Sequence, residues 1–270
     1  MKRLAVSHAR ESLGLSERKA CWLVNISVSV YRYEPKLGND SALRNRLREL
    51  AAQRKRFGSP RLHILLKREG LVINHKRTER LYREEGLALR RKRRRKGAAG
   101  ARVIMPSPQR KNERWSMDFV TDSIVTGRRF RALAIVDDYS RECPAIEVDT
   151  SLGGRRVVGV LDRLAEIRGL PEVITMDNGP EFAGRALDEW AYSKGVKLNF
   201  IRPGKPIENA LAESFIGRLR DECLNTNWFM NLKHARDIIE DWRKDYNEVR
   251  PHSSLNGSTP KEYAEITAGL

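Results

Sequence analysis

The chain has 270 residues, and 40% of them are hydrophobic, which is enough to bury a real core and excludes a disordered chain. Its 52 Lys and Arg outnumber its 35 Asp and Glu, so the net charge is +17 and the pattern favours a polyanionic partner. The three cysteines lack C-x-x-C spacing, which excludes a disulfide framework and a zinc site of that type. No signal-peptide-like segment and no run of 18 apolar residues occurs, so we expect a cytoplasmic protein with no membrane partner.

The charge is divided unevenly along the chain. Residues 41–96 contain 20 Lys and Arg against 5 Asp and Glu, a net charge of +15. Residues 113–270 contain 22 Lys and Arg against 26 Asp and Glu, a net charge of −4. We therefore expect the first region to bind phosphates and the second to contain a site that attracts cations.

Residues 1–38 predict two short helices separated by a turn. Ser16 can cap the first helix, Asn25 marks the turn, and residues 27–31 form the second. This layout resembles a helix-turn-helix, and an ordinary helical hairpin is the alternative.

Residues 41–90 predict a basic module of three helices. The first contains leucines at helical spacing from Leu43, the break at residues 58–60 ends it, a second helix begins at Arg61, and Asn74 caps a third over residues 75–85. The clustered charge favours DNA contact over a bundle with a merely solvated charged face. The candidates for DNA contact in this module are Arg61, Lys76, Arg77 and Arg80.

Residues 91–112 predict a flexible basic linker. The run Arg90–Lys96 repels itself and is followed by Gly97-Ala98-Ala99-Gly100. Such a linker adds salt-dependent phosphate contacts without reading sequence, and a solvated tether is the alternative.

Residues 113–270 predict an α/β region with a mixed five-stranded sheet covered by helices. The expected strands are residues 115–120, 130–136, 145–148, 172–176 and 196–200. The expected helices are residues 154–167, 180–193, 207–224 and 233–249, the last being the final long helix.

Three acidic residues occupy positions where this layout can bring them together. Asp118 lies inside the first strand, Asp177 directly follows the fourth strand, and Glu213 lies on the third helix. Active sites gather at such strand ends in sheets with helical crossovers. Carboxylates hold Mg²⁺ together with water and phosphate oxygens, and two such ions can activate an attacking hydroxyl and stabilise a leaving oxygen. The pattern therefore predicts catalysis of phosphodiester chemistry with two Mg²⁺ or Mn²⁺ ions.

The sequence around these acids closely resembles the transposases of the insertion-sequence-three family, the product of the downstream reading frame. The resemblance covers nearly the whole chain, and Asp177 and Glu213 are separated by the 35 residues of that family's acidic triad. The matching stretches are WSMDFV (115–120), VDDYSRE (136–142), DNGPEF (177–182), RPGKPIENALAESFIGRLRDECLN (202–225), RPHSSL (250–255), GSPRLHILL (58–66) and HKRTERLYREEGLAL (75–89).

The resemblance implies a ribonuclease-H-like fold shared with retroviral integrases, preceded by a small all-helical DNA-binding region. It implies that Asp118, Asp177 and Glu213 are catalytic metal ligands for cleavage at transposon ends and strand transfer into target DNA. It also implies self-association, an upstream reading-frame product as a partner, and a bacterial, nucleoid-associated location. One departure is Ile216, where the family often has Asn one turn from Glu213.

Residues near the triad are candidates for supporting roles. Asn178 and Glu181 flank Asp177 and are expected to orient the metal ligands without binding the metal themselves. Lys205 and Arg220 are candidates for DNA contact, and a surface salt bridge is the alternative for Arg220.

Other polar residues are expected to be structural. Asp137 and Asp138 are interpreted as turn or capping residues, and His252 as a hydrogen-bonding residue. Glu208 would lie on a different helix face from Glu213 and is rejected as the third ligand.

Two other functions fit parts of the pattern. A DNA-binding subunit or regulator, inactive without the upstream product, is the main alternative. A nuclease acting on RNA–DNA hybrids is disfavoured by the basic N-terminal module and by the family resemblance.

Overall fold

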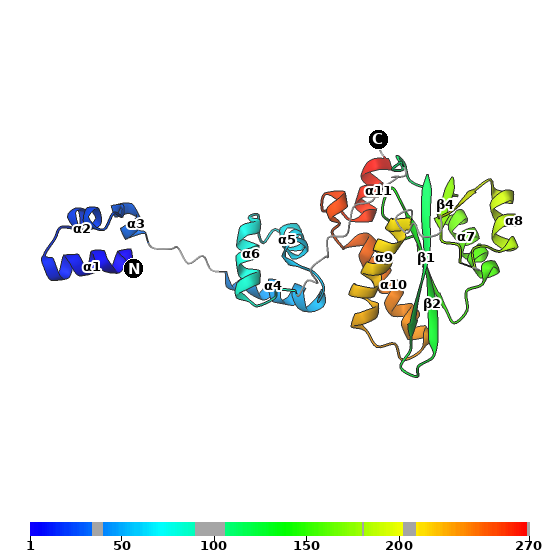
Figure 1. Cartoon of the computed structure of the whole chain (residues 1–270), viewed down its shortest axis with the longest axis horizontal. Helices are drawn as coiled ribbons and strands as arrows, with labels where there is room; N and C mark the ends of the chain where they lie inside the picture. Colours follow the sequence, from blue (N-terminus) through cyan, green and yellow to red (C-terminus); the bar gives the residue numbers. More distant parts are fainter. Residues whose placement is uncertain (34–39, 90–105, 180, 202–208, 269–270) are drawn as a thin grey trace. The chain divides into compact units, whose positions relative to one another are not determined.

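The computed structural model describes residues 1–33, 40–89, 106–179, 181–201 and 209–268. The chain divides into two compact units, Met1–Asn45 and Arg46–Leu270. Most of the predicted linker, together with Lys205 and Glu208, lies outside the described residues. Figure 1 colours the elements along the chain.

The first unit contains three short helices where two were predicted. They are α1 (Lys2–Leu13), α2 (Glu17–Leu23) and α3 (Val28–Arg32). The Ser16 side chain accepts a hydrogen bond from the Lys19 amide at 3.4 Å, as its capping role requires. The two predicted helices are present as α2 and α3. α1 was not predicted because its sparse apolar positions gave no clear periodicity, although Val6 and Ala9 are buried against α2.

The predicted three-helix region is confirmed by α4 (Ser41–Gln53), α5 (Ser59–Arg68) and α6 (His75–Glu84). The side chain of Asn74 accepts a hydrogen bond from the Lys76 amide at 3.0 Å and caps α6. Gly70 and Gly86, which follow α5 and α6, have φ angles of 73° and 67°. Glycine adopts these left-handed conformations at little cost, so both helices end at these positions.

The remainder of the second unit is built on a five-stranded mixed sheet. Its strands are β1 (Arg114–Ser123), β2 (Arg129–Asp137), β3 (Ala145–Asp149), β4 (Val173–Met176) and β5 (Lys197–Phe200). The strand order is β3-β2-β1-β4-β5. β1 pairs antiparallel with β2 and parallel with β4, so it lies at the centre of the sheet (Figure 1).

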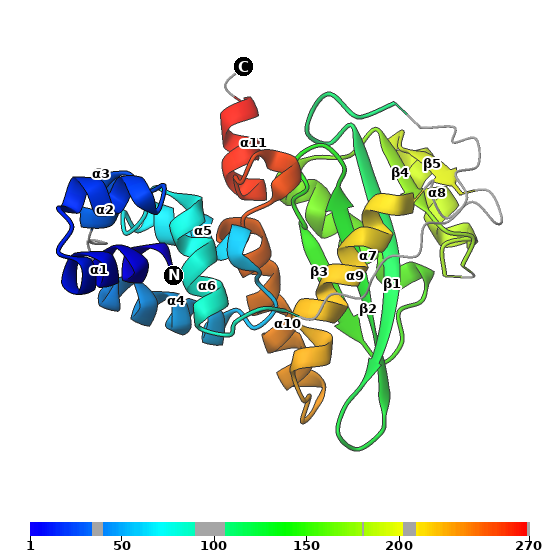
Figure 2. The same cartoon turned by 60° about the vertical axis from the view of Figure 1, so that its left-hand side comes forward.

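Helices cover both faces of this sheet (Figure 2). One core joins Met117, Leu133 and Ile174 to α7 (Gly154–Arg168) and α8 (Arg185–Lys194). The other joins Val120, Phe130 and Ala132 to α9 (Ala210–Glu222) and α10 (Leu232–Glu248). Alternate residues of β1 therefore face opposite helix layers, as the period of a strand requires. This is the ribonuclease-H-like arrangement that the sequence predicted.

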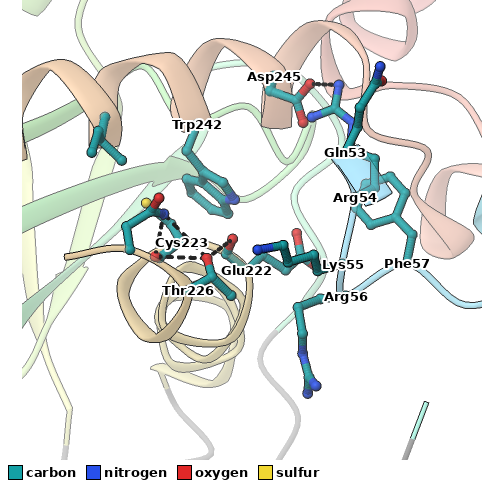
Figure 3. A pocket seen from close by; sticks show the side chains of 12 residues that line it. Gln53, Arg54, Lys55, Arg56, Phe57, Glu222, Cys223, Thr226, Trp242 and Asp245 are labelled. Atoms are coloured by element: carbon teal, nitrogen blue, oxygen red, sulfur yellow. Dashed lines mark hydrogen bonds and ion pairs between the residues drawn. The ribbon is translucent and has the colours of Figure 1, made fainter. Parts of the chain in front are cut away.

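Arginines of the three-helix region form ion pairs with acids of the α/β region. Arg56 pairs with Asp221 at 2.5 Å, Arg61 with Glu222 at 2.9 Å, and Arg68 with Glu262 at 2.7 Å. Arg54 pairs with Asp245, beside a hollow of about 330 Å³ (Figure 3). Charge complementarity thus holds the basic helices of this unit against its acidic ones.

One predicted helix start was wrong. α8 begins at Arg185 rather than at residue 180, because Gly184 is its N-cap and residues 181–184 form turns. The described part of α9 begins at Ala210, and the predicted start at residue 207 lies outside the described residues. A short helix, α11 (Pro260–Ala268), follows the one predicted to be the last long helix.

The remaining short elements are the 3-10 helices η2 (Leu224–Thr226) and η3 (Ser253–Leu255). All three cysteines are buried and unpaired, in keeping with their sequence spacing. In the ranges described above, no helix combines the length and apolarity needed to cross a bilayer.

Candidate active site

Asp118 lies in the middle of the central strand, on the face covered by α9. Its neighbours Met117 and Phe119 pack toward α7 and α8, so the alternation of the strand turns Asp118 to the other side. One carboxyl oxygen accepts a hydrogen bond from the Phe119 amide at 2.7 Å. The residue is only partly exposed, so its carboxyl group is partly shielded from solvent.

Asp177 directly follows β4, the parallel neighbour of the strand that carries Asp118. The last paired residues of β1 and β4 are Ser116 and Thr175, two positions before each acid, and the charge of Asp177 acts on Asp118. The Gly179 amide donates to an Asp177 carboxyl oxygen at 3.1 Å. A Cβ at position 179 would lie 3.0 Å from the same oxygen, so glycine gives this turn room to fold over the carboxylate.

Glu213 lies in the first turn of α9, and its side chain is exposed. The start of this helix is tied to the central strand by Asn209, whose side-chain amide donates to the Met117 carbonyl at 3.1 Å. Asn209 is buried, and within the described ranges its Oδ1 atom has no hydrogen-bond partner. The contact brings the helix that carries Glu213 to the residue adjoining Asp118.

The three carboxylates share one electrostatic environment. The pKa of Asp118 is raised to about 6, mainly by burial and to a smaller extent by the negative charges of Asp177 and Glu213, against the opposing effect of the Phe119 amide. Among the described residues, no three acidic, histidine or cysteine side chains enclose a common ion position. A two-cation site does not require such a cage, because each ion takes one or two carboxylates and completes its shell with water and phosphate oxygens.

The loop after Asp177 is clamped to the sheet by contacts that the sequence did not predict. Glu181 forms an ion pair with Arg131 of β2, which holds the pKa of Glu181 below its usual range. Arg131 also lies over the Phe119 ring, 4.3 Å from its centroid, and that ring stacks on Phe182 at 4.8 Å. These contacts place Glu181 beside Arg131, where it helps to hold the loop that carries Asp177.

Asn178, the other expected supporting residue, lies on the opposite side of this loop. Its side-chain amide donates to the Ile201 carbonyl at 2.8 Å, which joins the turn after β4 to the end of β5. Both flanking residues therefore fix the backbone around Asp177.

The predicted DNA-contact residues have different surroundings. Lys76 and Arg80 are exposed on α6, and Arg80 pairs with Glu84 at 3.0 Å. Arg77 is partly buried, whereas Arg220 is exposed and donates weakly to the Thr121 carbonyl at 3.4 Å. Arg61 instead pairs with Glu222 and lies over the Phe57 ring at 5.2 Å, so it packs inside the unit.

The residues interpreted as structural have buried partners. Asp137 accepts hydrogen bonds from the amides of Asn112, Tyr139 and Ser140 at 2.8–3.0 Å, and Asp138 pairs with Arg114 at 2.5 Å.

His252 is also enclosed. It is 3% exposed and packs edge-on against Tyr246, with a ring separation of 4.6 Å. Burial and then the charge of Arg250 lower the pKa of His252 to about 3, so the ring is neutral, as a structural role requires.

Asn209 and Arg131 are the two site residues that the sequence reasoning missed. A polar residue four positions before Glu213 was a detectable sign of a helix start. Arg131 had no such sign, because only the pairing of β1 with β2 brings it beside the loop after β4.

Three families match consecutive parts of the chain. The HTH-like domain matches residues 39–95, and two Integrase core domain families match residues 108–206 and 194–260. The HTH-like match thus falls on the three-helix region and not on the first 38 residues, where the sequence suggested a helix-turn-helix.

Similar proteins come from insertion elements. A 31.7 kDa protein of insertion element IS407 from Burkholderia multivorans is 51% identical over 96% of this chain and 94% of its own. A 39.2 kDa protein of insertion element IS476 from Xanthomonas euvesicatoria is 44% identical over 97% of this chain and 76% of its own. A chain of the simian T-cell lymphotropic virus intasome in complex with PP2A regulatory subunit B56 gamma shares the fold, with a TM-score of 0.54 at 14% identity over 81% of this chain and 74% of that one. The protein therefore belongs to the insertion-sequence-three family of transposases, with an HTH-like region followed by an integrase core.

Proposed function

We propose that this transposase cleaves DNA at the ends of its insertion element and joins the released 3′ ends to target DNA, using Asp118, Asp177 and Glu213 to hold two Mg²⁺ or Mn²⁺ ions. The observation that supports this most is that the three acids converge on the central strand: Asp177 directly follows β4, which pairs with the strand that carries Asp118, and the Asn209 bond to Met117 ties the start of the helix that carries Glu213 to that strand. The raised pKa of Asp118 agrees with this arrangement. Clustered acids that repel one another favour bound cations, because a cation relieves the repulsion that otherwise favours protonation.

The donor set suits hard divalent cations. All three side chains offer carboxylate oxygens, which Mg²⁺ and Mn²⁺ prefer over sulfur and nitrogen ligands. When bound, such cations supply charge stabilisation to the phosphodiester and lower the pKa of the attacking hydroxyl.

The chain's own residues fix the positions of these carboxylates. Asp118 is held by the central strand, and Asp177 is held by the Gly179 amide and by the clamp of Arg131 on Glu181. Glu213 is positioned through the Asn209 bond to Met117. Three carboxylates on separate, mutually braced elements suit a reaction in which geometry supplies much of the rate.

DNA contact is proposed for the basic three-helix region, through Lys76, Arg77 and Arg80 on α6. Phosphate contacts of this kind position DNA without reading its sequence, and they weaken as salt increases. Self-association is proposed as well, because two element ends must be held together during transfer. Whether joining also requires an upstream reading-frame product is tested by adding that product to the assay described next.

The test compares Asp177→Ala with Asp188→Ala, an exposed acid on α8 that serves as a matched control. Purified variants are assayed for joining of labelled element ends to plasmid DNA with Mg²⁺ or Mn²⁺, and for DNA binding by gel shift. Asp177→Ala should lose at least about a hundredfold in joining while its DNA affinity changes little, and Asp188→Ala should behave as the original protein. Equal joining by the two variants would remove Asp177 from the metal site.

A second readout measures metal binding directly. Titration of the protein with Mn²⁺, followed by electron paramagnetic resonance, should show weaker binding in Asp177→Ala than in Asp188→Ala. Unchanged Mn²⁺ binding would contradict the proposed ligand set even if joining were lost.

A further inference from the structure

A groove of about 1370 Å³ runs between the three-helix region and α9. Its walls come from the start of α5, the middle of α9, and the segment of residues 251–257 that contains η3. A volume of this size exceeds the roughly 300–1,000 Å³ of small-molecule sites, so it suits an elongated ligand.

The groove begins one helical turn from Glu213. Gly217, which lines it, is four residues further along α9 and therefore lies on nearly the same helix face. A Cβ added at Gly217 would meet no atom within 4 Å, so the helix surface is open at this point. A chain lying in the groove could therefore continue toward the candidate active site.

The charges that line the groove are balanced except at one residue. Asp221 is paired with Arg56, and Glu222 is paired with both Arg61 and Arg250. Arg218 also lines the groove, and it has neither a hydrogen bond nor an ion pair within the described ranges. Arg218 is partly buried, and its charge contributes to lowering the pKa of Arg61 and of His252.

An unpaired, partly buried arginine is an energetically unfavourable feature that an anion would relieve. The opposite wall offers uncharged hydrogen-bonding groups at Ser253 and Asn256, both exposed. A groove lined by a guanidinium together with hydroxyl and amide groups matches a phosphodiester backbone, whose oxygens accept bonds from both kinds of donor.

We propose that this groove binds the sugar–phosphate backbone of one DNA strand on its way to the active site, with Arg218 as its phosphate contact. The proposal rests on the proposed function, because it assumes a DNA substrate. It assigns the site to backbone recognition, so binding there is independent of base sequence and sensitive to salt.

The test measures the affinity of the full chain for a fluorescein-labelled 30-base-pair duplex of random sequence, by anisotropy, over a series of salt concentrations. Arg218→Ala is compared with Lys197→Ala, which removes the same charge from an exposed position on β5, at the far edge of the sheet. Arg218→Ala should bind about three- to tenfold more weakly, and its plot of log affinity against log salt should be shallower by about one. Lys197→Ala should match the original protein.

A second pair of variants tests the opposite wall without touching α9. Ser253→Asp places a negative charge in the groove, whereas Ser254→Asp places it on the neighbouring exposed residue, which does not line the groove. Only Ser253→Asp should weaken DNA binding. If Arg218→Ala melts at a lower temperature than the original protein, its weaker DNA binding could reflect lost stability, and the Ser253→Asp and Ser254→Asp pair then tests the groove assignment.

The outcomes separate the two proposals. If the original protein binds the duplex but Arg218→Ala matches Lys197→Ala and Ser253→Asp matches Ser254→Asp, the groove assignment is wrong and the proposed function stands. If the original protein binds no DNA at any salt concentration, the proposed function fails and the groove assignment fails with it.

Discussion

The cluster of Arg250, Glu222 and Arg61 allows the stability of the second unit to be tested at a single carboxylate. Arg250 donates two bonds to Glu222, each 2.7 Å long, and the side chains of Arg250 and Glu222 are only 2% and 7% exposed. Arg61 adds a third bond to Glu222 at 2.9 Å, but its side chain is 33% exposed and can turn toward water. Glu222→Ala would therefore leave the buried Arg250 guanidinium without the carboxylate to which it is hydrogen-bonded, and only the more distant charge of Asp245 would offset it in part.

Removing one partner of a buried ion pair costs about 3–5 kcal/mol, which corresponds to a fall of roughly 6–20 °C in melting temperature for a unit of this size. The adjacent Asp221 provides a matched control, because its pair with Arg56 is 48% and 38% exposed on the two side chains. Asp221→Ala should cost no more than about 1 kcal/mol, or about 4 °C. Melting is followed by circular dichroism.

Two results would refute this reasoning. One is an equal loss of melting temperature in Glu222→Ala and Asp221→Ala. The other is the failure of Glu222→Leu combined with Arg250→Met to recover most of the loss, because well-packed apolar residues usually replace a buried pair without penalty.

Three further predictions concern the active site and the C-terminal helix. Burial and the neighbouring carboxylates raise the pKa of Asp118 to about 6 in the folded protein, so this carboxyl ionises at a lower pH in the unfolded chain than in the folded one. The free energy of unfolding should therefore fall by at most about 3 kcal/mol as pH rises from about 4 to about 6. In EDTA, the melting temperature of Asp118→Asn should not show this fall with rising pH. The same dependence of melting temperature on pH in the variant and the original protein would contradict the prediction. Arg131→Ala should lower joining about ten- to a hundredfold with little effect on DNA affinity. The double variant Arg131→Glu with Glu181→Arg exchanges the two charges and should restore part of the joining activity. No recovery in the double variant would argue against a role of the Arg131–Glu181 ion pair. Thr259→Ala should cost about 0.5–2 kcal/mol in thermal unfolding through loss of its capping bond, and Ser258→Ala is the control that should cost less.

Helix ends and strand positions were largely predictable because they depend on local chemistry. Gly70 and Gly86 ended helices where the backbone turns left-handed, and Asn74 capped α6 through its own side chain. α11 could also have been predicted, because Thr259 and Glu262 form a reciprocal capping box with bonds of 3.1 and 2.7 Å. The start of α8 was missed because Gly184, rather than a polar side chain, caps it.

The three acids were chosen from their residue types, their places in the predicted elements and their spacing, and their catalytic role stays a prediction. Their surroundings were not predictable, since each depends on contacts between distant segments. The same is true of Arg61, which the charge count assigned to DNA and which pairs with Glu222 across 161 positions of the chain. The local sequence gives the position of an arginine in its helix but does not indicate which distant acid or ligand it pairs with.

The sequence by itself determined the order of most elements, the place of Asp118 inside the first strand, and the family to which the chain belongs. These follow from neighbouring residues, whose spacing sets the periodicity and the turns. Only the tertiary structure decided that the charges of Asp177 and Glu213 act on Asp118, that Arg131 holds the loop after Asp177, and that Arg218 lines a groove with no ion-pair partner among the described residues. Such features arise when strand pairing and helix packing bring remote charges together, because the energy of a charge depends on what surrounds it in space.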